Sequence, residues 1–155
     1  MMKIRTISTL IVLIALGCSD DSVPPLLMEL ETDHFSLMLP IGWQLEVQQG
    51  YDSHVGYFYG RGTNSDRIYY DQGGIASFQT VDDLSPDDET ISFERLSING
   101  VPAVIEKSNA IHDPNANVYL KLYVGGEEDP SNQLTVIDPK NEKLIVAIFK
   151  THRFL

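Results

Sequence analysis

Apolar and polar residues alternate over much of this chain with a period of two, which is typical of half-buried β-strands. In one segment, for example, Phe35, Leu37 and Leu39 fall on the same face. The pattern predicts strands over residues 35–39, 43–47, 55–59, 67–70, 118–124 and 133–137. Aromatic and β-branched residues are frequent in these segments, which favours the same interpretation.

Short turn-forming sequences separate the segments. Pro40-Ile41-Gly42 follows the first strand, and residues 60–66 are rich in glycine and polar side chains. Asn99-Gly100 suits a type I′ hairpin turn, because both central residues of that turn have positive φ. Two further strands are therefore expected around Asn99-Gly100. Since short turns join antiparallel neighbours, the sheet is expected to be mostly antiparallel.

One segment near the C-terminus departs from the alternation. Its apolar residues fall at i, i+1, i+4 and i+5, as on one face of a helix: Leu144, Ile145, Ile148 and Phe149. Asp138 and Pro139 suit the N-cap and the first helical position. The same residues could form a buried strand, which periodicity alone does not exclude. We expect a helix over residues 139–150 that covers the sheet, which gives an α+β fold with a twisted, mostly antiparallel sheet.

The first 18 residues have the organisation of an export signal. Lys3 and Arg5 precede a short apolar run over residues 11–16, which is too short to span a bilayer and is followed by Gly17. Cys18, the only cysteine, comes next in a sequence that resembles the lipobox of bacterial lipoproteins. That resemblance implies that the Cys18 thiol is lipidated and anchors the protein to a membrane. The alternative is a cleaved secretory signal that leaves an unmodified thiol.

These features divide the chain of 155 residues into three parts. We expect a signal peptide over residues 1–17, a lipidated cysteine with a flexible tether over residues 18–31, and a single α+β domain over residues 32–155. Asp20 and Asp21 resemble the acidic surface-export signal of Bacteroidetes lipoproteins. The expected location is therefore the outer membrane of a cell envelope, either exposed at the surface or facing the periplasm.

The charge of the chain narrows the class of partner. The formal net charge is −11, and 43% of the residues are hydrophobic. A strongly acidic protein is a poor match for nucleic acid or anionic lipid, which attract basic surfaces. Because a single cysteine cannot form an internal disulfide, the domain is expected to depend on a hydrophobic core.

Several stretches of the mature chain resemble known proteins. The sequence over residues 35–43, with Pro40, Gly42 and Trp43, is similar to the first strand and turn of PsbP-like and Mog1-like α+β proteins. Further stretches resemble a group of small Bacteroidetes lipoproteins: residues 50–56, 70–73, 98–100 and 148–154. The resemblance implies a PsbP/Mog1-like fold and an envelope location. Its motifs are structural and imply no chemistry.

Sequence motifs for catalysis are absent from the chain. It has no Gly-x-Ser-x-Gly, no His-Glu-x-x-His and no phosphate-binding glycine loop. The four histidines are widely separated in sequence and are expected at the surface or in turns: His34, His54, His112 and His152. We therefore predict no catalytic residues, no metal site and no cofactor.

Three groups of acidic residues are candidate cation sites by composition. Residues 113–117 begin like an EF-hand calcium loop, but Val118 and Val124 stand where that loop needs glycine and glutamate. We expect a polar turn there. The clusters over residues 82–89 and 127–129 are expected to be solvated loops.

The best candidate for binding is a region rich in tyrosine and arginine. Its members are Tyr57, Tyr59, Arg61, Arg67, Tyr69, Tyr70 and Asp71. If their strands pair, Tyr57 and Tyr59 share a face on which tyrosine and arginine can contact a ligand or partner. The alternative interpretation is ordinary cross-strand aromatic pairing within a sheet.

Two functions follow from these observations. The first is a non-enzymatic envelope lipoprotein that binds a protein or glycan through its sheet or loops. The alternative is an envelope hydrolase with an unrecognised active site, which requires titratable groups such as His54, Arg67 and Asp71 to be buried together.

Overall fold

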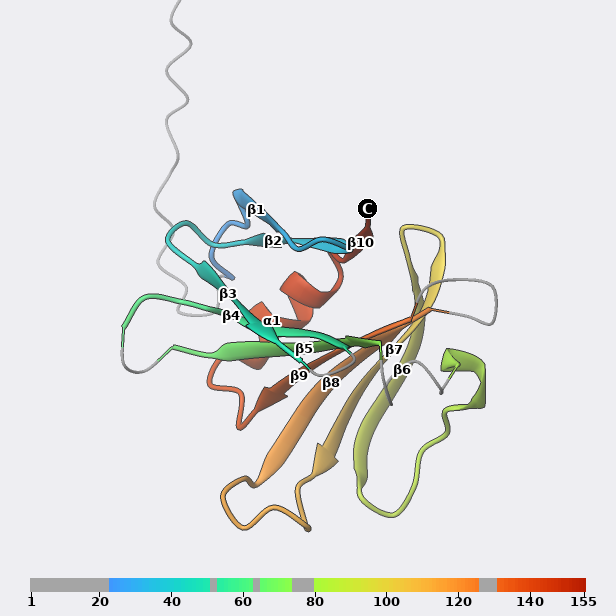
Figure 1. The fold of residues 1–155 in the computed structure, drawn as a ribbon. Coiled ribbons are helices and arrows are strands. Elements are labelled where there is room, and N and C mark those ends of the chain that lie inside the picture. Colours follow the sequence, from blue (N-terminus) through green and yellow to red (C-terminus); the bar gives the residue numbers. More distant parts are fainter. Residues whose placement is uncertain (1–22, 51–52, 63–64, 74–79, 126–130) are drawn as a thin grey trace, which may run out of the picture.

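A seven-stranded antiparallel sheet forms the larger layer of the fold (Figure 1). The computed structural model describes residues 23–50, 53–62, 65–73, 80–125 and 131–155. The strands of the large sheet lie in the order β3 (Gln44–Gln49), β4 (Ser53–Tyr59), β5 (Arg67–Gly73), β9 (Asn132–Ile137), β8 (Val118–Val124), β7 (Val101–Asn109) and β6 (Thr90–Ile98). Two meanders, β3-β4-β5 and β6-β7-β8-β9, meet where β5 pairs with β9.

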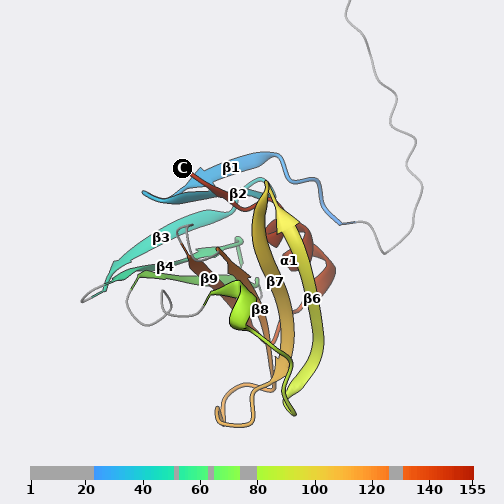
Figure 2. The ribbon, with the colours of Figure 1, turned by 90° about the vertical axis from the view of Figure 1, so that its right-hand side faces the viewer.

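A smaller sheet and one helix complete the fold. The small sheet consists of β1 (Met28–Glu31), β2 (Phe35–Leu39) and β10 (Arg153–Phe154), with β2 in the centre. Helix α1 (Glu142–Phe149) packs against β2, and Figure 2 shows the curved large sheet with the small sheet across one end. A short 3₁₀ helix, Val81–Asp83, lies between β5 and β6 in the sequence.

The hydrophobic core lies where these three layers meet. Alternate residues of the large sheet point to the inner face, which is why every second position in β5, β8 and β9 is buried. The largest fully buried apolar side chains come from all three layers: Phe35, Leu37, Leu39, Phe58, Ile68, Leu120, Leu122, Leu134, Ile145, Ile148 and Phe149. Their removal from water is the main favourable contribution to folding.

The structure confirms the antiparallel sheet, the C-terminal helix and the hairpin. All strand pairs in the described part of the chain are antiparallel, and residues 142–149 are helical. Asn99 and Gly100 have φ values of 51° and 87°, as a type I′ turn between β6 and β7 requires.

The predicted start of the helix is wrong. Asp138 has a φ of 46° and accepts hydrogen bonds from the backbone N–H groups of Asn117 and Val118, so it ends β9 in a turn. Asn141 is the N-cap, because its side chain accepts a hydrogen bond from the Leu144 N–H. The Asp66 carboxylate accepts hydrogen bonds from the backbone N–H groups of Lys140 and Asn141. The helix therefore begins three residues later than the expected first position.

The expected boundary between tether and domain also needs correction. Residues 28–31 were expected to belong to the tether, but they form strand β1 and pair with β2. Glu29 accepts hydrogen bonds from Ser36 of β2 and Arg153 of β10, so its side chain connects β1 to the other two strands of the small sheet. Regular structure thus begins before residue 32. Residues 1–22, with Cys18, lie outside the described part of the chain.

The described residues contain no helix with the length and apolar character needed to cross a bilayer.

Candidate functional site

The outer face of the large sheet carries most of the residues predicted to bind a partner. Strands β4 and β5 pair so that Tyr57 is opposite Tyr69, and Tyr59 is opposite Arg67. The ring centroid of Tyr57 lies 5.5 Å from that of Tyr59 and 5.7 Å from that of Tyr69. We call Tyr57, Tyr59 and Tyr69 the tyrosine platform. Tyr57 and Tyr69 form a cross-strand pair, and the three rings are also partly open to solvent, with Tyr69 37% exposed.

The other end of this outer face is covered. Arg95 on β6 donates hydrogen bonds to the carbonyl oxygens of Val81 and Leu84, which holds the 3₁₀ segment against the sheet. Burial raises the pKa of Tyr123, on β8, to about 12. The 3₁₀ segment thus covers part of the outer face over β6 to β8, whereas the tyrosine platform on β4 and β5 is partly exposed to solvent.

Two charged side chains, Arg67 and Glu46, meet at Tyr57. The guanidinium of Arg67 lies 5.2 Å from the ring centroid of Tyr57, and its hydrogen bond with Tyr69 is the main cause that raises the Arg67 pKa. Glu46 on β3 is opposite Tyr57, and its hydrogen bond is the main cause that raises the pKa of that tyrosine. At neutral pH the Tyr57 phenol is therefore neutral and lies beside the charged Arg67.

Two cavities, one of about 280 Å³ and one of about 480 Å³, are large enough for a small polar group. The larger of these two adjoins the platform. The larger cavity, which we call the arginine pocket, is lined by Gln44, Tyr59, Gly60, Arg61, Gly62, Ser65 and Arg67. The Ser65 hydroxyl donates hydrogen bonds to the carbonyl oxygens of Gly60 and Gly62, which fixes this side of the loop. Within the described part of the chain, neither Arg61 nor Arg67 forms an ion pair.

Tyr70 and Asp71 have separate positions. Tyr70 points to the inner face, where its ring centroid lies 5.4 Å from that of Phe35. Asp71 is half-buried on the outer face, and its Oδ1 atom has no hydrogen-bond partner among the described residues. The structure therefore brings together five of the predicted binding residues, places Asp71 at their edge and assigns Tyr70 to the core.

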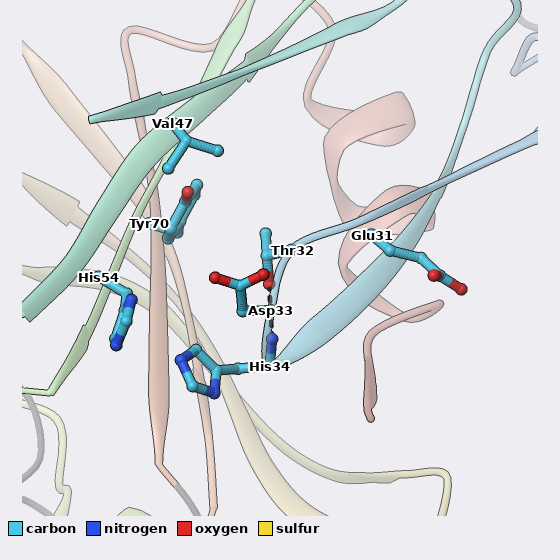
Figure 3. A pocket seen from close by; sticks show the side chains of 7 residues that line it. All are labelled: Glu31, Thr32, Asp33, His34, Val47, His54 and Tyr70. Atoms are coloured by element: carbon cyan, nitrogen blue, oxygen red, sulfur yellow. Dashed lines mark hydrogen bonds between the residues drawn. The ribbon is translucent and has the colours of Figure 1, made fainter. Parts of the chain in front are cut away.

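A second cavity, the histidine pocket, lies between the two sheets (Figure 3). Its lining residues are Glu31, Thr32, Asp33, His34, Val47, His54 and Tyr70. The rings of His34 and His54 meet edge to face with centroids 4.3 Å apart. The Nε2 atom of His34 is buried without a hydrogen-bond partner among the described residues. Sequence spacing gave no sign of this contact, because the two histidines come from different sheets.

The groups in the histidine pocket limit its chemistry. The Thr32 hydroxyl donates to the carbonyl oxygen of Phe35 and accepts the His34 and Phe35 N–H groups, so it is not a free nucleophile. Burial, with a smaller contribution from Asp33, raises the pKa of Tyr70 and keeps its phenol neutral. In the described residues, no three histidine, cysteine or carboxylate side chains are placed to hold a metal ion.

The surface position expected for His152 is wrong. Its side chain is buried, and its ring stacks on Phe35 with centroids 5.0 Å apart. The Asn132 amide nitrogen lies 3.0 Å from His152 Nε2. Burial lowers the pKa of His152 to about 4, so this histidine is a neutral part of the core at physiological pH.

The remaining sequence candidates occupy turns. Asp113 accepts hydrogen bonds from the Asn115 N–H and the Tyr119 hydroxyl, as expected for a polar turn before β8. Asp87 accepts from Thr90 and the Glu89 N–H in a similar turn before β6. The acidic cluster over residues 127–129 lies outside the described residues.

His54, Arg67 and Asp71 are not buried together. His54 lies in β4 on the inner side of the sheet, whereas Arg67 and Asp71 lie on the outer side, and both His54 and Arg67 are exposed. The condition set by the sequence for a hydrolase built on these three residues is therefore not met.

Comparison of the chain with protein-family models, curated proteins and solved structures finds no match.

Proposed function

We propose that this chain is a lipoprotein of a bacterial envelope whose domain binds a protein or glycan through the tyrosine platform, without catalysing a reaction. In this proposal Cys18 carries the lipid, the membrane is the outer membrane, and the α+β domain is of the PsbP/Mog1-like type. The observation that carries the binding function is the cluster of partly exposed tyrosine rings beside two arginines that form no ion pair with any described residue.

Tyrosine and arginine suit a binding surface for physical reasons. A tyrosine ring contributes a large rigid contact area, and its hydroxyl forms hydrogen bonds at the rim of a contact. Tyrosine and arginine are also enriched among the residues that dominate binding energy at interfaces. The chain covers the β6 to β8 end of the same sheet face with its own residues, which supports a distinct use for the open β4 to β5 end.

The lipid anchor is tested by metabolic labelling with radioactive fatty acid. We expect the wild-type protein to incorporate label and the Cys18→Ala variant to lose it, because the proposed thioether forms at that thiol. Each buried methylene of an acyl chain contributes about 0.8 kcal/mol to membrane affinity, so the unlabelled variant is expected to leave the membrane fraction as well. Labelling that persists in the variant would contradict the anchor.

The binding function is tested by capture from the native membrane. We expect full-length protein to retain a protein or glycan after mild crosslinking, and a Tyr57→Ala/Tyr59→Ala double variant to lose at least about 90% of it, because a tenfold loss corresponds to about 1.4 kcal/mol. A Tyr119→Ala variant is the matched control, since Tyr119 lies on the same sheet face outside the platform. Equal capture by the double variant would contradict the proposal.

The hydrolase alternative has one specific observation in its favour, which is the contact between His34 and His54 in a cavity with Asp33. In that case an imidazole would act as general base on a water, since the Thr32 hydroxyl is already hydrogen-bonded. A panel of ester, glycoside and phosphoester substrates tests it. Turnover that is lost in His34→Ala and His54→Ala, and kept in the exposed His112→Ala control, would favour this alternative over the binding proposal.

A further inference from the structure

We propose that the arginine pocket binds the carboxylate of an acidic saccharide whose neighbouring sugar rings lie on the tyrosine platform. This inference rests on the proposed binding function and names its ligand class.

The charge distribution is the first step. The chain has a net charge of −11, yet two exposed arginines line one pocket and neither forms an ion pair with a described residue. Three lysine or arginine side chains of the described domain form salt bridges with acidic partners: Lys107 with Glu142, Lys150 with Glu94, and Arg153 with Glu29. Glu46 offsets part of the Arg67 charge. Two arginine side chains at one pocket, neither in a salt bridge with a described residue, still favour an anionic ligand.

The arginine side chains of the pocket suit a carboxylate. A planar guanidinium donates two parallel hydrogen bonds to a carboxylate, which a single lysine ammonium cannot do. Arg61 and Arg67 come from opposite ends of the loop that joins β4 to β5, so their guanidinium groups can approach one anion from two sides. Gly60 and Gly62 leave this side of the pocket without side chains, and a Cβ at Gly62 would meet no atom within 4 Å.

The tyrosine platform selects a saccharide as the remainder of the ligand. Strands β4 and β5 are interior strands, and β5 pairs with β9 over residues 69–71, so most backbone groups at the platform are already paired and are not free to bind an extended peptide. Contact must come from side chains. The half-buried rings of Tyr57 and Tyr59 offer flat apolar faces for the C–H face of a sugar, and their hydroxyls can bond to sugar hydroxyls.

Glu46 fixes the direction of the ligand. Its carboxylate lies at Tyr57, within electrostatic reach of Arg67, and would repel a second anion there. The acidic group is therefore expected at the arginine pocket, with uncharged rings over Tyr57.

The test is calorimetric titration of the purified full-length protein with oligogalacturonate and with its methyl ester, which keeps the rings and removes the charge. We expect oligogalacturonate to bind at least about tenfold more tightly than the ester, and binding to weaken as salt is added. Arg61→Gln and Arg67→Gln are each expected to weaken oligogalacturonate binding by about tenfold. Arg153→Gln, an exposed arginine of the small sheet, is the matched control and is expected to bind normally.

Three results would overturn the inference: equal affinity for the acid and the ester, unchanged binding by the Arg61→Gln variant, or no binding of oligogalacturonate by the wild-type protein. Circular dichroism of each variant establishes that it is folded. The capture experiment with the tyrosine variants is separate. A partner captured through Tyr57 and Tyr59, with no preference for the charged saccharide, would leave the binding function in place and remove only this ligand class.

Discussion

Replacing Phe35 by alanine is expected to lower the free energy of unfolding by about 4 kcal/mol. Phe35 is completely buried in β2, and its ring contacts residues of both sheets and the C-terminal segment. Its centroid lies 5.9 Å from that of Phe58, 5.4 Å from Tyr70 and 5.0 Å from His152. Truncation would remove these contacts and leave a cavity where the layers meet. Since domains of this size are stable by about 5 to 15 kcal/mol, the loss is a large fraction of the total.

The measurement is chemical denaturation monitored by tyrosine fluorescence and circular dichroism. Phe35→Leu keeps most of the volume and is expected to lose only about 1.5 kcal/mol, so it remains measurable if the alanine variant is unfolded. Phe93→Ala is the matched control, because Phe93 is half-buried on the outer face, and about 1 kcal/mol is expected there. Equal losses for Phe35→Ala and Phe93→Ala would show that the core is not centred on β2.

The second large effect is a loss of stability in mild acid through His152. Burial lowers its folded-state pKa from 6.5 to about 4, and the unfolded chain restores the ordinary value. Between these two values the unfolded state binds a proton that the folded state does not. Stability is therefore complete above the unfolded pKa and decreases as pH falls toward about 4, by about 3 kcal/mol in total.

The free energy of unfolding at about pH 7.5 and about pH 5 tests this expectation, with a loss of about 2 kcal/mol predicted for the wild-type protein. The His152→Gln variant does not titrate and should lose much less over the same interval. Asp87 and Asp138 have lowered pKa values because of hydrogen bonds in the folded state, so their contributions disappear at lower pH than this interval. The same pH slope in wild type and His152→Gln would rule out His152 as the cause.

Much of the fold could be predicted from the sequence, because the alternation of apolar and polar residues and the residue types of turns are local properties. Strands β2, β8 and β9 and the Asn99-Gly100 turn follow directly from patterns of a few residues. Strand β1 was missed because its four residues lie beside a polar, proline-containing stretch, and its stability comes from pairing with β2. The division into two sheets depends on long-range packing, which no local pattern reports.

The candidate site could likewise be predicted only in part. Tyr57 and Tyr59 are predicted to share a face because they are two residues apart in one strand, and the pairing of β4 with β5 adds Arg67 and Tyr69. The contact between His34 and His54 joins two sheets and has no local signal. The sequence predicts His152 at the surface because polar side chains are usually exposed, whereas this ring is buried beside Phe35.

The most direct test of binding through the tyrosine platform is tyrosine-specific chemical labelling, read by mass spectrometry, of the protein in intact cells and after purification. An occupied platform predicts that Tyr57, Tyr59 and Tyr69 react less in the envelope than in the purified protein, while Tyr119 reacts equally in both. Equal reaction of the three platform tyrosines in both settings would contradict the proposed function.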